Sequence, residues 1–279
     1  MTYGFDAFSP REIAERVEAA GVAKTHLPLV SLVMLGMLAG AFIALGSLYY
    51  VVVESDPALG WAVRRVLGGA VFSLGLLLVV VAGAELFTGN NLLAMAWADG
   101  KVSTADVLFN WFVVCAANFA GALAIAGLVF LSGHLEMNGG AIGRTYLSIA
   151  AAKTALPFWT AFFSGVMCNV LVCLAIWMTL AGRSVADKAI AIVFPVSAFV
   201  AAGFEHSIAN MYFIPLAMMV QAAAGQPVEF AGLFRNLVPV IAGNLVGGSV
   251  LVALVYYVIY RWSARDTAAA PSAVDRAGP

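Results

Sequence analysis

Two short segments hold the side chains best suited to proton or hydrogen-bond chemistry inside this apolar chain. One segment contains Glu85 and Thr88, and the other contains Glu205 and His206. Histidine changes its protonation state near neutral pH, and an ionisable group at membrane depth is rare and usually functional. His206 is therefore a candidate for giving a proton to a substrate or holding it by hydrogen bonds, with the Thr88 hydroxyl facing it.

A purely structural role is the alternative for each ionisable group. Glu85 and Glu205 would each tie the ends of a broken helix by accepting backbone N–H bonds, and their presence in both segments favours that role. His206 would be a neutral imidazole that bonds Asn169 or Asn210 and only lines a wall.

The composition indicates which class of protein positions these residues. Of the 279 residues, 63% are hydrophobic and 10% are charged, and the net charge is −1. A soluble surface needs more charge, and a nucleic-acid binder needs a basic footprint. The composition thus argues against a soluble enzyme, a nucleic-acid binder and a disordered chain, and favours a multi-pass membrane protein. No thiol pair or motif has the spacing of a metal or cofactor site, so neither is expected.

Apolar runs long enough to cross a bilayer, which takes about 20 residues, predict six membrane-spanning helices. Four runs are uninterrupted, and two contain the polar segments described above. We therefore expect an all-α protein whose second and fifth helices are broken. The expected spans are residues 27–53, 66–97, 105–131, 154–181, 189–221 and 239–262.

The two ends of the chain differ from this transmembrane domain, which we place at residues 27–262. Residues 1–26 contain the capping box Ser9-Pro10-Arg11-Glu12 and predict an amphipathic helix on the membrane or against the protein. An order–disorder change of that helix is a candidate gate. Residues 263–279 are rich in Ala and are expected to be disordered. Lys and Arg favour the side of the termini, so both termini are expected in the cytoplasm.

The chain contains two similar halves. In each half, a broken helix with Glu and Asn five residues apart precedes a helix with two Asn eight residues apart. Because each half has three helices, the two copies must be inverted in the membrane. The matching pairs are Glu85 and Asn90 with Glu205 and Asn210, and Asn110 and Asn118 with Asn236 and Asn244.

The inverted repeat predicts a pore. Paired broken helices place both breaks near the bilayer midplane, and the backbone groups freed there must be buried in protein or line a solvated path. His206 has no counterpart in the first half, where Leu86 follows Glu85. This asymmetry indicates a specialised task for the histidine.

Apolar residues near the breaks are candidates for a constriction. Phe72 and Leu76 share one helix face before the first break, and Phe199 lies two turns before His206. A narrow apolar passage excludes ions by dewetting, and contact with lipid or core is the alternative. Lys153 is either an ordinary interfacial lysine or a cation that raises the local concentration of anions.

The stretches Glu85-Leu-Phe-Thr88 and Gly203-Phe-Glu-His-Ser-Ile-Ala-Asn210 resemble the formate/nitrite transporter family. The resemblance runs from about residue 10 to residue 262 and includes Gly243-Asn-Leu-Val-Gly-Gly248. It implies a homopentamer of aquaporin-like protomers in the inner membrane, each with its own pore and with cytoplasmic termini.

The resemblance also implies roles for single residues. His206 is expected to face Thr88, and Lys153 is expected to lie near the outer vestibule. The asparagines of the family match Asn169, Asn210 and Asn244. The expected constriction residues are Phe72, Leu76, Leu86, Phe87 and Phe199.

Together these observations predict a transporter of small monovalent anions and not an enzyme. The resemblance favours formate, with nitrite, hydrosulfide, acetate or lactate as the alternative. Flux is expected to depend on pH, either through a proton passed by His206 or through a channel that only hydrogen-bonds its substrate. A neutral-solute channel of the aquaporin type would want Asn-Pro-Ala at both breaks, which this chain lacks. A membrane-embedded enzyme would need a nucleophile or a metal beside Glu205 and His206.

Overall fold

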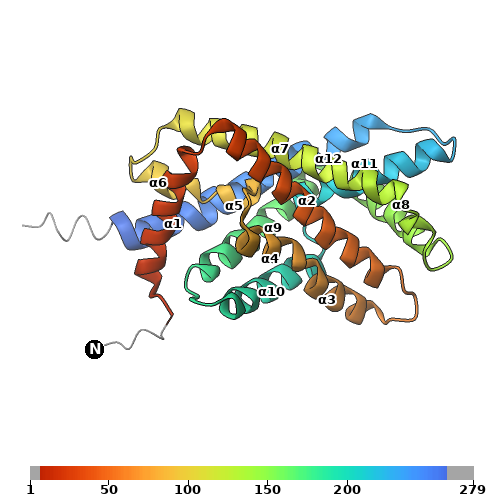
Figure 1. The fold of residues 1–279 in the computed structure, drawn as a ribbon, viewed down its shortest axis with the longest axis horizontal. Coiled ribbons are helices and arrows are strands. Elements are labelled where there is room, and N and C mark those ends of the chain that lie inside the picture. The colour runs from red at the N-terminus through yellow and green to blue at the C-terminus, as the bar shows by residue number, and fades with distance from the viewer. Residues whose placement is uncertain (1–6, 263–279) are drawn as a thin grey trace, which may run out of the picture.

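The computed structural model describes residues 7–262, and over this range the chain is helical with no strand (Figure 1). Within the same range, six helical segments are long and apolar enough to cross a membrane. The spans are α2 (Leu29–Glu54), α3 with α4 and η1 (Trp61–Phe72, Leu74–Leu78, Val79–Gly83), α7 (Thr104–Leu131), α9 (Phe158–Thr179), α10 (Val185–Ala202), and α12 with η3, α13 and η4 (Phe230–Leu245, Val246–Leu254, Val255–Tyr257, Val258–Trp262). The other helices are α1 (Pro10–Thr25), α5 (Phe87–Asn90), α6 (Leu93–Ala98), η2 (His134–Glu136), α8 (Ala141–Thr154) and α11 (Ser207–Ala223).

Both predicted breaks are present, and each begins at a glycine. In the first half, η1 ends at Gly83, whose φ is +87°, and α5 resumes at Phe87. In the second half, α10 is capped by Gly203, whose φ is +78°, and α11 resumes at Ser207. A positive φ disfavours residues with a Cβ, so glycine lets the chain leave each helix abruptly. The expected fold, with its broken second and fifth helices, is confirmed.

Four predicted span starts were wrong. The second and fifth spans begin at Trp61 and Val185 and not at residues 66 and 189. The fourth span begins at Phe158 and not at residue 154, because Thr154 ends the separate helix α8 and Pro157 caps the next helix. The sixth span begins at Phe230 and not at residue 239, because Pro239 lies inside α12. Polar residues in the first turns of α12 hid this part of the helix from a search for apolar runs.

The two halves share one type of close helix crossing. In the first half α2 packs against α7, and in the second half α9 packs against α12. At each crossing, glycines of the helices touch backbone carbonyl groups of their partners, as small residues do in membrane helix pairs. These glycines are Gly40 and Gly121 in the first half, and Gly243 and Gly247 in the second.

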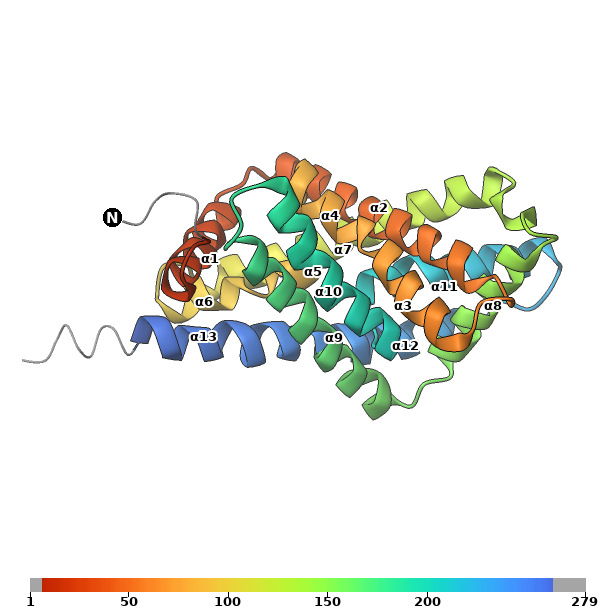
Figure 2. The ribbon, with the colours of Figure 1, turned by 90° about the horizontal axis from the view of Figure 1, so that it is seen from below.

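Helix α1 lies across one end of the bundle, against α6, and not along the other helices (Figures 1 and 2). Its apolar side chains, including Ile13 and Val17, are buried in a cluster with residues of α6, α9 and η3. Glu18 is 1% exposed and forms ion pairs with Lys101 and Arg261. The backbone N–H and hydroxyl of Ser9 bond Glu12 and lower the pKa of that carboxyl. The helix thus packs against the protein.

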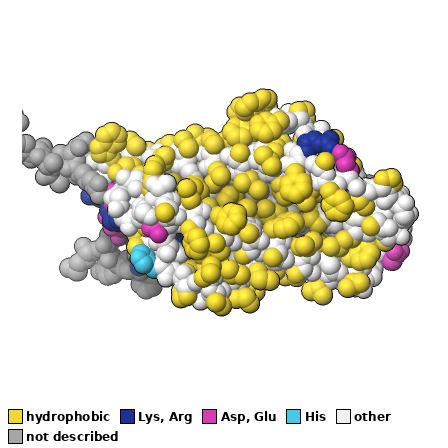
Figure 3. All heavy atoms as spheres, turned by 90° about the horizontal axis from the view of Figure 1, so that it is seen from above, with side chains coloured by type: hydrophobic (Ala, Val, Ile, Leu, Met, Phe, Trp, Pro, Cys, Tyr) yellow, Lys and Arg dark blue, Asp and Glu magenta, His cyan; other side chains and the backbone are white. Residues whose placement is uncertain are grey.

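The outer surface is apolar over most of its area. Figure 3 shows hydrophobic side chains across the broad middle of one face and charged side chains near its two ends. Exposed residues include Phe112, Leu131 and Phe194. An apolar belt of this extent suits contact with lipid or with other membrane-embedded protein surfaces.

The close crossing of α2 and α7 gives a stability prediction. A methyl group added at Gly121 would meet the backbone carbonyl of Met37, whereas one added at Gly127 on the same helix would meet nothing within 4 Å. We expect Gly121→Ala to lower the free energy of unfolding by about 1–3 kcal/mol. Gly127→Ala should leave it unchanged or raise it slightly, because alanine favours helix. Thermal unfolding in detergent measures both, and equal melting temperatures for the two variants would contradict the prediction.

Candidate functional site

Three cavities follow one another through the centre of the bundle. The Lys153 cavity, of about 190 Å³, is bounded at its inner end by Phe72, Phe199 and His206. The same three residues border the central cavity, of about 10 Å³, which is closed on its other side by Leu86. Leu86 in turn lines the Lys24 cavity, of about 310 Å³. The central cavity has room for about one water molecule, so the passage narrows sharply where the two breaks meet.

His206 and Thr88 face each other at this narrowing. The Nε2 atom of His206 lies 3.1 Å from the Thr88 hydroxyl oxygen. The Nδ1 atom accepts the backbone N–H of Ala209 at 3.2 Å and so caps α11. A nitrogen that accepts a hydrogen bond carries no proton, so the imidazole is neutral and its proton is on Nε2. His206 therefore donates to the Thr88 oxygen, and the Thr88 hydroxyl proton is left for another acceptor.

Aromatic rings form one side of the constriction. The His206 ring stacks on Phe199 at a centroid distance of 5.8 Å, and Phe199 meets Phe72 edge to face, also at 5.8 Å. Leu76 lines the central cavity beside them. Phe87, the fifth expected constriction residue, lines none of the three cavities and is buried in the core.

Two asparagines hold the backbone at the breaks. Asn118 accepts the N–H of Phe87 at 2.9 Å and donates to the carbonyls of Gly36 and Glu85 at 2.7 and 2.9 Å. Asn244 does the same in the other half. It accepts the N–H of Ser207 at 3.0 Å and donates to the carbonyls of Gly165 and Glu205 at 2.8 and 3.1 Å. The two halves thus satisfy their freed backbone groups identically.

The carboxylate of Glu205 bonds side chains. Lys153 donates to it at 2.8 Å, and the amide groups of Asn210 and Asn236 donate at 2.6 and 3.2 Å. The expectation that the two glutamates accept backbone N–H bonds is therefore wrong, because the N–H groups of residues 87 and 207 go to Asn118 and Asn244. The bond to Glu205 also directs the Lys153 ammonium into the protein.

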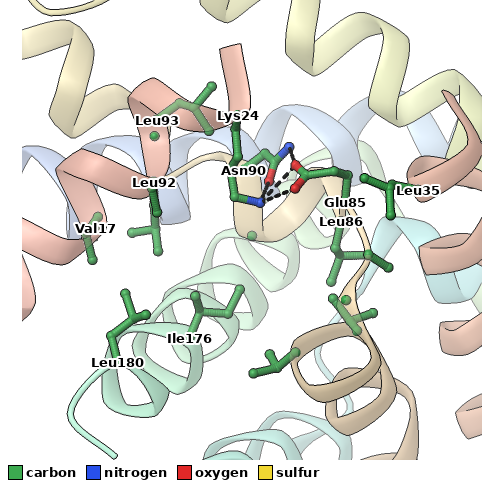
Figure 4. A pocket seen from close by; sticks show the side chains of 17 residues that line it. Val17, Lys24, Leu35, Glu85, Leu86, Asn90, Leu92, Leu93, Ile176 and Leu180 are labelled. Atoms are coloured by element: carbon green, nitrogen blue, oxygen red, sulfur yellow. Dashed lines mark hydrogen bonds and ion pairs between the residues drawn. The ribbon is translucent and has the colours of Figure 1, made fainter. Parts of the chain in front are cut away.

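Lys24 is a site residue that the sequence analysis missed. Its ammonium donates to both oxygens of Glu85, at 2.7 and 2.8 Å, and to Asn90 at 2.9 Å (Figure 4). Asn90 also bonds Glu85 and Asn110, as Asn210 bonds Glu205 and Asn236. Each half thus places one lysine beside its glutamate, which are Lys24 beside Glu85 and Lys153 beside Glu205.

Asn169 lies beside the break and does not bond His206. Its amide group donates to the Thr88 carbonyl at 3.2 Å and to Asn244 and Asn91 at 2.7 Å. Asn210 does not bond the imidazole either, so the expected bond from His206 to one of these asparagines is replaced by the bond to Thr88. Asn169 holds the loop that carries the Thr88 hydroxyl.

Comparison with known proteins places this arrangement in a family. The family model for the formate/nitrite transporter matches residues 11–258. The chain belongs to the formate/nitrite transporter family. Members of this family are membrane transporters, so the protein is a multi-pass membrane transporter and not an enzyme.

Individual relatives of this transporter are similar over nearly the whole chain. The "Uncharacterized transporter YrhG" of Bacillus subtilis is 41% identical over 90% of this chain and 93% of its own. The "Formate channel FocA" of Escherichia coli K12 is 38% identical over 92% of this chain and 95% of its own. A solved "Pentameric formate channel with formate bound" covers 83% of this chain and 97% of its own, with 37% identity and a TM-score of 0.77. An "FNT family ion channel" covers 89% and 98%, with 30% identity and a TM-score of 0.80.

The matched asparagines give a second stability prediction. Replacing Asn118 or Asn244 with alanine leaves two buried groups at the break without a partner, which are the N–H of residue 87 or 207 and the carbonyl of residue 85 or 205. The carbonyls of Gly36 and Gly165 lie inside α2 and α9 and keep their helical hydrogen bonds. Each unpartnered group costs about 1–3 kcal/mol, so each variant should lose at least about 2 kcal/mol of unfolding free energy, by a similar amount in both halves. Thermal unfolding in detergent measures the loss. The control is Ser132→Ala, which removes a bond to the Val129 carbonyl of its own turn and one from the backbone N–H of His134, both outside the breaks. A melting temperature like that of wild type in either asparagine variant would contradict the account.

Proposed function

We propose that this transporter passes formate across the membrane through a pore within each protomer. The observation that carries the proposal is the row of three cavities that meet at His206 and Leu86. Relatives named formate channels, and a solved channel described with formate bound, support formate as the substrate. Nitrite is the second candidate, because the family is described as a formate/nitrite transporter and nitrite is also a small bent monovalent anion. Hydrosulfide, acetate and lactate remain candidates for slower passage.

The two wide cavities would bind the anion before it reaches the constriction. The Lys153 ammonium has three N–H donors, and Glu205 accepts one of them. The donors that remain can bond an entering carboxylate. The Lys24 ammonium instead has three acceptors around it, two from Glu85 and one from Asn90. Lys153 therefore offers the stronger site for an anion.

The constriction would pass the substrate by hydrogen bonding. A bare carboxylate is costly in an apolar slot, and its affinity for a proton rises as it loses water. His206 donates to the Thr88 oxygen, so the Thr88 hydroxyl can donate its proton to a substrate oxygen. In this version the flux follows the gradients of formate and pH. The proton-coupled version requires an imidazolium, whose protonated Nδ1 would give up the bond from Ala209.

The same proposal includes the assembly and the placement in the membrane. We propose a homopentamer in the inner membrane with both termini in the cytoplasm, so that the Lys153 cavity opens outward and the Lys24 cavity opens to the cytoplasm. The solved pentameric relative and the apolar outer surface support the pentamer. The greater number of Lys and Arg on the side of the termini supports the orientation. Residues 1–26 would be the cytoplasmic N-terminal segment with its amphipathic helix, and 27–262 the channel. Residues 1–6 of that segment and the proposed disordered tail, 263–279, lie outside the described residues.

Swelling of proteoliposomes tests the function directly. We expect rapid swelling with formate, slower swelling with nitrite, and no more swelling with glycerol than in protein-free liposomes. Swelling with glycerol at the rate of formate would favour a neutral-solute channel of the aquaporin type. A lack of formate flux from correctly assembled protein would refute the proposal.

His206→Asn separates the two versions of the mechanism. Asparagine is also a good N-cap, so it can accept the N–H of Ala209 while removing the Nε2 proton. The hydrogen-bonding version predicts that formate flux falls about 10- to 100-fold by the same factor at acidic and neutral pH, as it should in Thr88→Val. The proton-coupled version predicts a change in the shape of the pH profile in His206→Asn only. Unchanged flux in His206→Asn would refute both versions.

A further inference from the structure

Arg65 of α3 lines the same cavity as Lys153 and bonds the C-terminal end of α10. Its Nε and one terminal nitrogen donate to the carbonyls of Ala201 and Val200 at 3.1 and 2.8 Å. The second terminal nitrogen donates to the hydroxyl of Tyr50 at 2.9 Å. Arg65 and Tyr50 both line the Lys153 cavity. The Arg65 guanidinium thus links its own helix α3 to α2 and to α10 by hydrogen bonds at the mouth of the proposed pore.

A cation at the C-terminal end of α10 offsets the partial negative charge of that helix end. The last carbonyls of a helix carry a partial negative charge. At the end of α10 the Val200 carbonyl also accepts the N–H of Gly203 at 3.0 Å, so Arg65 is its second donor. Here these carbonyls belong to the break, and Phe199, which lines the constriction, precedes Val200 directly. Without Arg65, the Lys153 cavity would present a negative helix end to an entering anion, and the segment after Phe199 would lose two of its anchors.

Among the described residues that line the Lys153 cavity, Arg65 is the cation without a carboxylate partner. Lys153 and Glu205 form an ion pair at 2.8 Å and offset each other. Within residues 7–262, the hydrogen bonds of the Arg65 guanidinium go only to neutral oxygens. Glu54 and Arg64 also lie near Tyr50, but they have opposite charges and line a separate cavity. The Lys24 cavity is lined by Lys24 and Glu85, which also pair. The positive charge that distinguishes the Lys153 cavity from the Lys24 cavity is therefore that of Arg65.

The repeat shows that Arg65 is not part of the common scaffold. When Glu85 is aligned with Glu205 and Gly83 with Gly203, the residue that corresponds to Arg65 is Val185. The arginine thus departs from the symmetry of the two halves, as His206 does opposite Leu86. Both departures border the Lys153 cavity.

We propose that Arg65 is a positioning and selectivity residue that makes the Lys153 cavity a binding site for small monovalent anions. It offsets the negative end of α10, supplies the surplus positive charge of the cavity and fixes the segment that carries Phe199. This inference rests on the proposed function, because it names the group that attracts the transported anion.

The test compares Arg65→Gln with Arg64→Gln in proteoliposomes, at about 10 mM and about 1 M salt. The two variants lose the same charge at neighbouring positions, but Arg64 bonds only the Glu54 carbonyl, at 3.4 Å, and does not line the Lys153 cavity. We expect Arg65→Gln to raise the formate concentration for half-maximal flux about 5- to 10-fold at low salt. At high salt the difference should fall below about 2-fold, because salt screens the charge. Arg64→Gln should stay within about 2-fold of wild type at both salt concentrations.

Three results would overturn the inference. The first is an equal shift of the half-maximal formate concentration in both variants. The second is a shift in Arg65→Gln that does not depend on salt, as a merely structural role predicts. The third is no shift in Arg65→Gln at all. If Arg65→Gln does not assemble, Arg65→Lys provides the test, since it keeps the charge. Its half-maximal concentration should keep the wild-type salt dependence, because the charge remains. A rise of about 5- to 10-fold at low salt that disappears at high salt, as a lost charge predicts, would overturn the inference. Absence of formate flux in wild type would refute the proposed function itself, whereas wild-type flux without an effect of Arg65→Gln would refute this inference alone.

Discussion

The structure depends on one requirement, which is that backbone groups freed at a helix break inside a membrane must find partners without water. Asn118 and Asn244 meet this requirement with three hydrogen bonds each, to the same set of positions in both halves. The bonds to Gly36 and Gly165 reach across to the neighbouring helix, which is possible because glycines let the paired helices touch at their backbones. The same asparagines therefore link each helix break to the close helix crossing beside it.

On this symmetric scaffold, the chemistry is asymmetric. Two elements occur in both halves. They are the Glu–Lys ion pairs, which line the two wide cavities, and the asparagines Asn118 and Asn244, which bond the backbone at the breaks. The unpaired elements lie on one side, where His206 stands opposite Leu86 and Arg65 stands opposite Val185. The duplicated three-helix unit thus forms the passage. The two residues that differ between the halves, His206 and Arg65, give it a hydrogen-bond donor and an excess of positive charge.

Much of this fold could be predicted from the sequence because its signals are local. Apolar runs gave the six spans, and the polar segments at Glu85 and Glu205 marked the breaks. The pairing of His206 with Thr88 followed from their places in opposing loops. These inferences needed only the cost of polar groups in hydrocarbon.

What could not be predicted depends on contacts between distant segments. Helix α8 was not recognised from the sequence as a helix of its own, so Lys153 was placed at the outer end of the fourth span and not at the end of α8. Lys24 lies in the N-terminal helix, and only the fold shows that this helix reaches Glu85. The partners of the glutamates also depended on which donors the two asparagines had already satisfied.

The central claim is that His206 is a neutral donor held between Ala209 and Thr88, and nitrogen NMR of the imidazole tests it most directly. The chain has three histidines, so replacing His26 and His134 with asparagine leaves His206 as the only imidazole to observe. The account predicts a neutral ring protonated on Nε2, with the same spectrum at pH 5 and pH 8. A ring protonated on Nδ1, or an imidazolium at either pH, would contradict it.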